Sequence, residues 1–389
     1  MIYHFNLAYL DGMSGGDKCT LEVVRYLVSQ KIKNTLITTY AGRDQFIAQG
    51  LAENSFCKYI VVPDCEPCEK GFEILIAYIK RTFEAYRLMN TIGVNDDDCF
   101  FCHNEFFPNI IPFTRLAKLH PTAKLIYHIH MIAPDLWKGY QGHFTGEINL
   151  PDLRLIRYRL EQWFFKKKVF QRALVLYNNS YYDDILARWF PENERHNIAK
   201  YSGVEVSQIS SGEKKYDLVW CGRFHVQKGL EEIPEIIAKL KRHKPNIKLA
   251  IIGSGDHAKK KLLRKIKKYN LRHNIELKGF LEGAKKFSVM KSSKVFLMTS
   301  YFESFGQVNL EAMKCGLPVV AYDLPVFEVF DKGMIRVPIK DNEKMALEIR
   351  HLLDNPEYYL QASQEAESFA KEFSWEKTGR EIYDVITEK

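Results

Sequence analysis

The residues best suited to binding a phosphate follow a short apolar run that ends at Trp220. From Cys221 to Gly229 the chain reads Cys-Gly-Arg-Phe-His-Val-Gln-Lys-Gly and then continues into a helical pattern. The guanidinium of Arg223 can form paired hydrogen bonds with phosphate oxygens, and Lys228 adds a second positive charge. The two glycines of the segment permit tight turns beside a ligand. The segment predicts a phosphate-binding loop, and the alternative is an exposed loop with incidental charges.

Two glutamates, Glu303 and Glu311, lie eight positions apart around the expected start of a helix near Phe305 or Gly306. A helix start presents unpaired backbone N–H groups and the positive end of the helix dipole to an anion. Glu311 lies about one turn inside the helix, where its carboxylate can accept hydrogen bonds from paired hydroxyls such as those of a ribose. Glu303 precedes the helix and can reach a sugar. Two glutamates at this spacing are common on charged helices, so the prediction of a binding site depends on their position after a strand.

The first half of the chain offers glycines and histidines at the ends of predicted strands. Gly15 and Gly16, in the segment that starts at Met13, follow the first strand and precede a helix; an ordinary glycine-rich turn is the alternative. His130 lies at the carboxyl end of another strand, while His128 is expected to pack within the sheet. His103 also ends a strand, and we expect it to line the site of an acceptor.

Together these segments resemble glycosyltransferase family 4, the retaining glycosyltransferases of the GT-B fold, over nearly the whole chain. The resemblance rests on Gly222-Arg223, on Lys228-Gly229 and on the glutamate pair. It implies that Arg223 and Lys228 hold the donor diphosphate, that Glu303 contacts the donor sugar and that Glu311 contacts the ribose. The turn between the halves, commonly Asn-Gly-Val-Asp in the family, here reads Ser-Gly-Val-Glu from Ser202 to Glu205.

The resemblance extends to further positions. It implies that the loop from Gly279 to Leu281 flanks the nucleobase and that His130 faces the transferred sugar. The expected catalytic residues are Glu303, His130, Arg223 and Lys228. The expected donor-binding residues are Gly15, Gly16, Phe280, Ser304, Phe305, Gly306 and Glu311, and the expected acceptor-binding residue is His103.

The elements that position these residues form two α/β domains. Short β-branched runs alternate with helix-length segments, which is typical of a doubly wound sheet. The expected strands are Leu36–Thr39, Tyr59–Val62, Cys99–Phe101, Lys124–Tyr127 and Leu174–Tyr177 in the first half, and Asp217–Trp220, Lys248–Ile252, Ile275–Leu277, Val295–Met298 and Pro318–Ala321 in the second.

We expect the GT-B fold, in which two Rossmann-like doubly wound α/β domains face each other across a cleft. The expected domains are residues 1–203, which bind the acceptor, and residues 204–370, which bind the nucleotide sugar. Residues 371–389 resemble the terminal helix that crosses back to the first domain. Ligands bind at the carboxyl ends of parallel strands, where both charged segments lie.

Composition and charge bear on where the protein acts and on what it can bind. The chain has 389 residues with 46% hydrophobic and 27% charged residues, and its net charge is +8. The start lacks the features of a secretory signal, and no apolar run is long enough to span a bilayer, so we expect a cytoplasmic protein. The expected partners are a nucleotide-diphosphate sugar and a carbohydrate or lipid-linked acceptor, without nucleic acid. The aromatic and basic stretch from Trp163 to Lys168 suggests peripheral contact with the inner face of a membrane, against the alternative of a solvated surface.

We expect no metal and no cofactor. The chain has two Cys-x-x-C pairs, Cys65 with Cys68 and Cys99 with Cys102. Residues three apart on a strand face opposite sides, so the second pair cannot bind one zinc ion. The aspartates from Asp96 to Asp98 precede a strand and are expected to form a turn.

The sequence therefore favours a metal-independent, retaining glycosyltransferase of the hexosyltransferase type, active in glycan biosynthesis. In such a reaction the acceptor hydroxyl attacks from the side that the nucleotide leaves, and a donor phosphate oxygen takes its proton. The alternatives are a non-catalytic glycosyltransferase-like subunit and a nucleotide-sugar epimerase on the same fold. A dehydrogenase is suggested only by the weak Gly-x-Gly-x-x-Ala pattern from Gly253 to Ala258.

Overall fold

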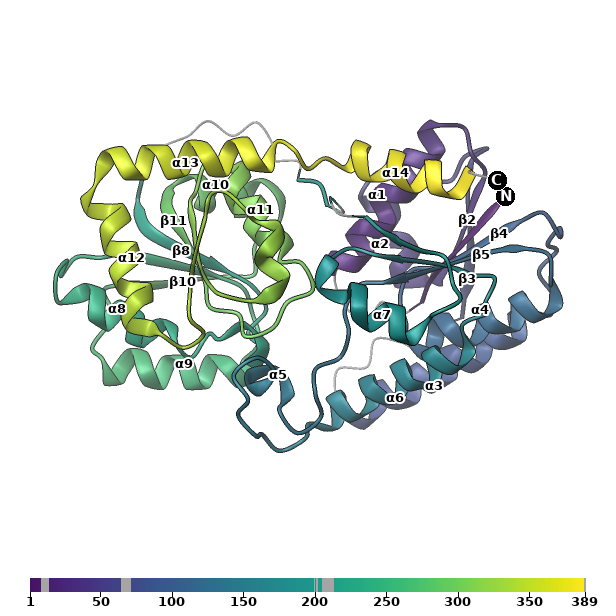
Figure 1. The fold of residues 1–389 in the computed structure, drawn as a ribbon, viewed down its shortest axis with the longest axis horizontal. Helices are drawn as coiled ribbons and strands as arrows, with labels where there is room; N and C mark the ends of the chain where they lie inside the picture. Colours follow the sequence, from purple (N-terminus) through teal and green to yellow (C-terminus); the bar gives the residue numbers. More distant parts are fainter. Residues whose placement is uncertain (8–13, 64–70, 199, 201, 205–212, 388–389) are drawn as a thin grey trace. The chain divides into compact units, whose positions relative to one another are not determined.

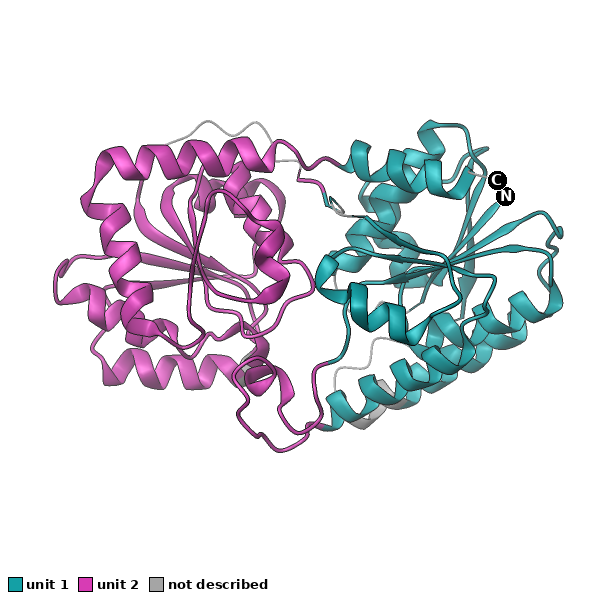
Figure 2. Ribbon diagram, in the orientation of Figure 1, with its two compact units in different colours: residues 1–133, 153–202, 375–389 teal, residues 134–152, 203–374 magenta. Residues whose placement is uncertain are grey.

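The computed structural model describes residues 1–7, 14–63, 71–198, 200, 202–204 and 213–387 (Figure 1). The chain divides into two compact units, each with its own parallel sheet (Figure 2). Unit 1 consists of residues 1–133, 153–202 and 375–389, and unit 2 of residues 134–152 and 203–374. The expected α/β architecture with two doubly wound sheets is confirmed.

Unit 1 contains a seven-stranded parallel sheet in the order β3-β2-β1-β4-β5-β6-β7. The strands are β1 (Ile2–Asn6), β2 (Asn34–Thr39), β3 (Cys57–Val62), β4 (Cys99–Cys102), β5 (Lys124–Ile129), β6 (Leu174–Tyr177) and β7 (Arg195–Asn197). The five strands expected in this half are all present, and the short β7 is an addition. The strand order reverses between β1 and β4, which creates the kind of switch point where ligands bind in open α/β sheets.

Apolar side chains on both faces of this sheet explain why helices cover both. In β4, Phe100 and Cys102 pack into one core, whereas Cys99 and Phe101 pack into the other. The two sulfurs therefore point to opposite faces, as expected; Cys65 and Cys68 lie outside the described residues. The helices of unit 1 are α1 (Gly15–Ser29), α2 (Tyr40–Ala48), α3 (Gly71–Leu88), α4 (Phe107–Leu119), α6 (Leu153–Lys168), α7 (Asp183–Trp189) and α14 (Trp375–Thr387).

The terminal helix α14 packs against α1 within unit 1. Its Ile382 and Val385 lie in the same core as Val23 and Leu27 of α1. A side chain at Gly379 would meet the Tyr26 ring at 2.4 Å, so the absence of one lets the helices approach closely. The last stretch of the chain is thereby held to the first.

Unit 2 contains a six-stranded parallel sheet in the order β10-β9-β8-β11-β12-β13. The strands are β8 (Tyr216–Cys221), β9 (Leu249–Ile252), β10 (Ile275–Gly279), β11 (Ser293–Met298), β12 (Val319–Tyr322) and β13 (Met334–Val337). Its helices are α5 (Gly139–Gly142), α8 (Ile233–Lys241), α9 (Asp256–Lys268), α10 (Gly283–Lys291), α11 (Gln307–Lys314), α12 (Asn342–Asp354) and α13 (Pro356–Ala370). The order again reverses beside the first strand, so the loops after β8 and β11 leave from neighbouring strands.

Residues 134–152 lie in unit 2, although the sequence placed them in the first domain. Gln141 donates a hydrogen bond to Glu231 at 2.7 Å, and Lys340 forms an ion pair with Glu147. These polar contacts join the segment to residues that are 90 and 193 positions away along the chain. No local periodicity encodes such contacts, which is why the sequence did not reveal the assignment.

Candidate active site

The loop after β8 bends back onto the end of β11. It contains a short 3₁₀ helix, η2 (Val226–Lys228), and Gly229 at φ +59°. A Cβ at Gly229 would lie 1.9 Å from the carbonyl oxygen of Thr299. Only glycine fits here, because both the left-handed backbone and the close approach exclude a side chain.

Hydrogen bonds hold this loop against the loop that carries the first glutamate. The Gln227 side chain donates to the Phe302 carbonyl at 2.8 Å, and the Tyr301 amide donates to the Gln227 carbonyl at 2.8 Å. The Thr299 hydroxyl donates to the Lys228 carbonyl at 3.0 Å. The cationic and acidic segments that the sequence singled out are thus brought together.

Lys228 and Glu303 form a partly buried ion pair. The Lys228 Nζ lies 2.5 Å from the Glu303 Oε1, and the side chains are only 17% and 7% exposed. Removing two charges from water costs several kcal/mol per ion, so such a pair adds little net stability. Its position at the ends of two strands is better explained by a polar or charged ligand than by folding.

A second ion pair was not expected from the sequence. The Lys286 Nζ of α10 lies 2.7 Å from the Glu311 Oε1 of α11, and these side chains are 18% and 9% exposed. Lys286 follows Lys285 in an ordinary charged helix and carries no motif. Each predicted glutamate therefore has a lysine partner, and both lysines come from other elements.

The helix α11 begins at Gln307 with Gly306 as its N-cap, within one or two positions of the expected start. Gly306 has φ +86°, and a Cβ there would meet the Asn309 Nδ2 at 2.7 Å. No side chain caps the helix, so its first N–H groups keep their capacity to bind an anion. Asn309 is fully buried, and its side-chain atoms have no hydrogen-bond partner among the described residues.

The other residues expected to bind the donor differ in their exposure. The Arg223 side chain is exposed and has no ion pair within the described part of the chain, and Phe280 is 64% exposed beside Gly279. The Phe305 ring is buried against Phe330 and Phe373, with ring centroids 5.5 Å and 6.0 Å away. A donor contact by Phe305 is thereby limited to its backbone, because the ring belongs to the core. Ser304 is half-buried.

Residues 134–152 cover the backbone beside Glu303. Phe302 stacks on Phe144 with a centroid distance of 5.7 Å and lies edge-on to Tyr140 at 5.6 Å. Tyr140 also contacts His225 of the loop after β8, at 5.6 Å. This aromatic cover excludes water from one side of the loop that carries Glu303, and sequence reasoning missed it.

In unit 1 the structure brings Gly16 and His130 together. Gly15 begins α1, whose N-cap Ser14 forms a capping box with Asp17. A Cβ at Gly16 would lie 3.9 Å from the His130 ring. The two segments are 114 residues apart in sequence, and both follow central strands of the sheet, so the topology joins them.

The half-buried His130 adjoins a cluster of three buried histidines, His4, His103 and His128. The His4 Nδ1 lies 2.8 Å from the His103 Nε2, and the His128 and His130 rings lie 4.0 Å apart. Burial lowers the pKa of His4 and of His130 to about 4, and it lowers the pKa of His103 and His128 well below the usual value. These imidazoles are therefore neutral at physiological pH.

Hydrogen bonds determine which nitrogens of His4 and His103 carry protons. The Asn34 side chain donates to the Ile32 carbonyl, so its oxygen accepts from the His4 Nε2 at 2.9 Å. The neutral His4 then accepts a hydrogen bond at Nδ1 from the His103 Nε2–H. His103 is 1% exposed and stacks on Phe101 at 4.1 Å, so the structure encloses the ring that the sequence placed at an acceptor.

Three features bear on metals and membranes. Within the described ranges no group of three or more His, Cys, Asp or Glu side chains is arranged to hold a metal ion. No helix of those ranges is long and apolar enough to cross a membrane. In the stretch from Trp163 to Lys168, Trp163 is 61% exposed but Phe165 is 1% exposed, so the Phe165 ring cannot contact a membrane as expected.

Comparisons with known proteins find similarity to glycosyltransferases. Residues 205–369 match the family described as glycosyl transferases group 1. An uncharacterized glycosyltransferase of Methanocaldococcus jannaschii is 25% identical over 81% of this chain and 82% of its own length. A second one from the same organism is 35% identical over 38% of this chain, and the match spans only 36% of that relative. The amylovoran biosynthesis glycosyltransferase AmsD of Erwinia amylovora is 33% identical over 36% of this chain and 39% of its own.

Solved structures share the fold along the whole chain. TarM of S. aureus aligns with a TM-score of 0.73 at 13% identity over 100% of this chain and 99% of its own. HepE of Anabaena, in complex with UDP-glucose, aligns with a TM-score of 0.72 at 14% identity over 99% of both chains. The fold is GT-B, and the comparisons together support a glycosyltransferase.

Proposed function

We propose that this chain is a retaining, metal-independent glycosyltransferase that moves a sugar from a nucleotide-diphosphate sugar to a carbohydrate or lipid-linked acceptor. The observation that carries the proposal is the two partly buried Lys–Glu ion pairs, with their buried glutamates, beside the uncapped start of α11. Buried charges are retained where a ligand needs them, because they contribute little to folding.

In this proposal the donor occupies the ends of β8 and β11. Arg223, Lys228 and the start of α11 at Gly306 stabilise the negative charge that grows on the departing diphosphate. Glu303 accepts hydrogen bonds from the sugar hydroxyls, and Glu311 accepts them from the ribose. Such preorganised contacts replace the charge compensation that a metal ion supplies elsewhere, and each is worth roughly 3 kcal/mol of the barrier.

The reaction follows from these roles. The acceptor oxygen bonds to the anomeric carbon as the bond from that carbon to the phosphate oxygen breaks, and both events occur on the same face of the sugar. The acceptor proton passes to a phosphate oxygen of the leaving diphosphate. No side chain of the chain forms a covalent bond with the sugar, and the anomeric configuration is retained.

Unit 1 supplies the remaining groups. We assign His130 to a hydroxyl of the transferred sugar, with Gly15 and Gly16 beside it. His103, whose ring is enclosed, supports the acceptor side as a positioning residue and does not contact the acceptor. A pKa of about 4 keeps His130 neutral, so it can donate or accept a hydrogen bond without opposing the positive charge that develops on the sugar. Phe280, Ser304 and the backbone of Phe305 complete the donor side.

The names of similar proteins support a glycan product. AmsD is named for amylovoran biosynthesis, and another relative, WclY of Escherichia coli, for O-antigen biosynthesis. Among structures with the same fold, HepE was solved with UDP-glucose and TarM with UDP. A uridine donor is therefore the first to test.

The test is hydrolysis of a panel of nucleotide sugars by the full chain in the presence of a chelator. We expect release of nucleoside diphosphate from one donor, lost in Glu303→Gln and kept in Glu357→Gln, which changes an exposed glutamate of α13 outside the site. NMR of the transfer product should show the donor's anomeric configuration, and an inverted product would refute the mechanism. Nucleotide binding by calorimetry without turnover would instead indicate a non-catalytic subunit.

A further inference from the structure

A small cavity lies on unit 1, and none of its lining residues belongs to the candidate active site. It has a volume of about 210 Å³. Its walls come from α6, from α7 and from the segment that follows His130, and they consist of Ile132, Ala133, Arg159, Gln162, Trp163, Lys166 and Trp189. Two indoles and two cations line the cavity, and none of these lining residues is acidic.

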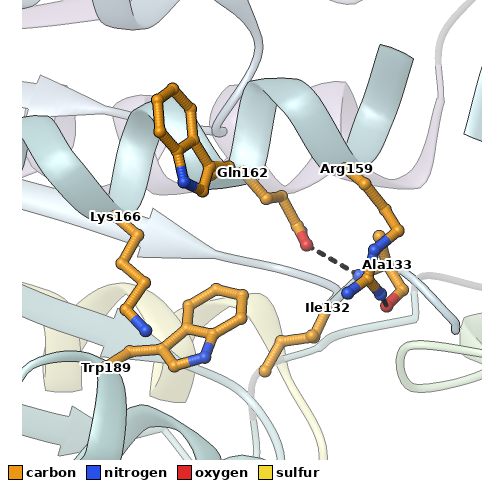
Figure 3. A pocket seen from close by; sticks show the side chains of 7 residues that line it. Ile132, Ala133, Arg159, Gln162, Lys166 and Trp189 are labelled. Atoms are coloured by element: carbon orange, nitrogen blue, oxygen red, sulfur yellow. Dashed lines mark hydrogen bonds between the residues drawn. The ribbon is translucent and has the colours of Figure 1, made fainter. Parts of the chain in front are cut away.

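The cations are held at defined places. The Lys166 Nζ lies 5.6 Å from the centre of the Trp189 ring, and the Arg159 guanidinium donates to the Ala133 carbonyl at 3.3 Å. Figure 3 shows Lys166 and Trp189 at one end of the cavity and Arg159 with Ala133 at the other. An occupant can thus reach an aromatic face and a positive charge at the same time.

The cavity shares its supporting contacts with the proposed acceptor side. The Gln162 side chain accepts from the Ala133 amide at 2.8 Å and donates to the Met131 carbonyl at 2.7 Å. It also donates to the buried Glu105 at 3.0 Å. Glu105 follows His103 by two residues, and Met131 directly follows His130. One buried glutamine therefore joins the wall of the cavity to both histidine loops.

We propose that this cavity binds an anionic sugar residue of the acceptor, an inference that rests on the proposed function and deepens it. The apolar face of the sugar ring packs on the indoles of Trp163 and Trp189, and its carboxylate or phosphate contacts Lys166 and Arg159. The volume, below the ~300 Å³ of typical drug-sized sites, admits a single ring or the end of a longer chain.

A membrane surface is the competing occupant, since Trp163 is 61% exposed and three lysines end α6. The cavity favours a small ligand instead. Trp189 is half-buried, and Gln162, which holds the cavity wall, is 4% exposed, so part of the lining is set back from the surface that a bilayer can reach.

The experiment uses the full chain labelled with 5-fluorotryptophan and observed by fluorine NMR. The chain has five tryptophans, and Trp163→Phe and Trp189→Phe assign the two resonances of interest. The probes are methyl glucuronide and glucose 6-phosphate, with methyl glucoside as the neutral match. We expect saturable shifts of both resonances with an anionic probe and not with methyl glucoside. The anionic probe that binds more tightly shows whether the cavity prefers a carboxylate or a phosphate.

The matched variants are Lys166→Ala and Lys167→Ala, since both lysines are exposed and only Lys166 lines the cavity. Lys166→Ala should weaken binding of the anionic probe at least fivefold, and Lys167→Ala less than twofold. The inference is overturned by an equal response to methyl glucoside, by no saturable shift, or by shifts with phosphatidylglycerol vesicles alone.

Donor hydrolysis separates this inference from the proposed function. Lys166→Ala should hydrolyse the donor at the wild-type rate, because Lys166 is not among the donor-side residues, but it should lose transfer to an anionic acceptor. Probe binding in a chain that hydrolyses no donor would refute the proposed function and leave the anionic-sugar site. Hydrolysis without probe binding would refute the site alone.

Discussion

Removing one or both charges of the Lys228–Glu303 pair tests whether unit 2 keeps this pair for folding or for function. With side chains 17% and 7% exposed, breaking the pair from one side leaves a charge with little access to water. Such a loss typically costs ~3–5 kcal/mol, whereas replacing both partners by neutral groups is often nearly neutral. We therefore expect Lys228→Met to destabilise unit 2 by about 3 kcal/mol and the double variant Lys228→Met/Glu303→Gln by less than about 1 kcal/mol.

Glu303→Gln should cost less than Lys228→Met. The ammonium that remains is 17% exposed, and its long stem can turn the charge towards water, so the expected loss is about 1–2 kcal/mol. The loss of turnover should not follow the loss of stability. All three variants should lose at least ~10²-fold in donor hydrolysis, because a positive charge at the diphosphate or a carboxylate at the sugar is missing in each.

The assay is urea unfolding followed by pulsed hydrogen exchange and mass spectrometry. Peptides from β8 and β11 report on unit 2, and peptides from β4 and β5 of unit 1 serve as the internal reference. A double variant as unstable as Lys228→Met would refute the reasoning, since it would show that the site requires the charges to fold. Full activity in the double variant would refute the assigned roles.

Three further predictions use the same measurements. Gly229→Ala should destabilise unit 2 by at least ~2 kcal/mol, because its Cβ would lie 1.9 Å from the Thr299 carbonyl oxygen at a φ of +59°. Arg223→Ala should lower donor turnover ~10²-fold or more while the exposed position keeps the stability loss within ~0.5 kcal/mol. His4 has a pKa of about 4 in the fold against 6.5 for an ordinary histidine. The neutral ring therefore makes its full contribution to the free energy of unfolding above pH 6.5 and loses it as the pH falls towards 4. At pH 5 the loss is about 2 kcal/mol.

The glycine and histidine predictions have controls of their own. Gly93→Ala is the match for Gly229, since a Cβ at Gly93 meets nothing within 4 Å, and equal losses in both would contradict the steric argument. The contribution of His4 is measured as the difference in the free energy of unfolding between the wild type and His4→Gln, from pH 8 to pH 5. A difference is needed because burial raises the pKa of Glu161 to about 7, and this carboxyl stabilises the fold as the pH falls over the same range. If the free energies of unfolding of the wild type and His4→Gln change in parallel with pH, His4 does not titrate as described.

The sequence was sufficient for the elements and for the location of the loops that carry Lys228 and Glu303. Ten of the strands were predicted from short β-branched runs, because burial on both faces of a parallel sheet leaves a local apolar signal. The carboxyl ends of parallel strands share one edge, so the segments with Lys228 and Glu303 could be placed together. The helix start at Gly306 followed from local chemistry.

Only the tertiary structure decided which distant groups meet. Lys286 pairs with Glu311, His4 with His103, and residues 134–152 cover Phe302, although none of these partners shares a motif. Phe305 was expected to lie along the donor, and the structure packs its ring into the core. Periodicity in the sequence records which side of an element is buried, but a contact between elements depends on how the packed helices and loops fill space, which no local pattern encodes.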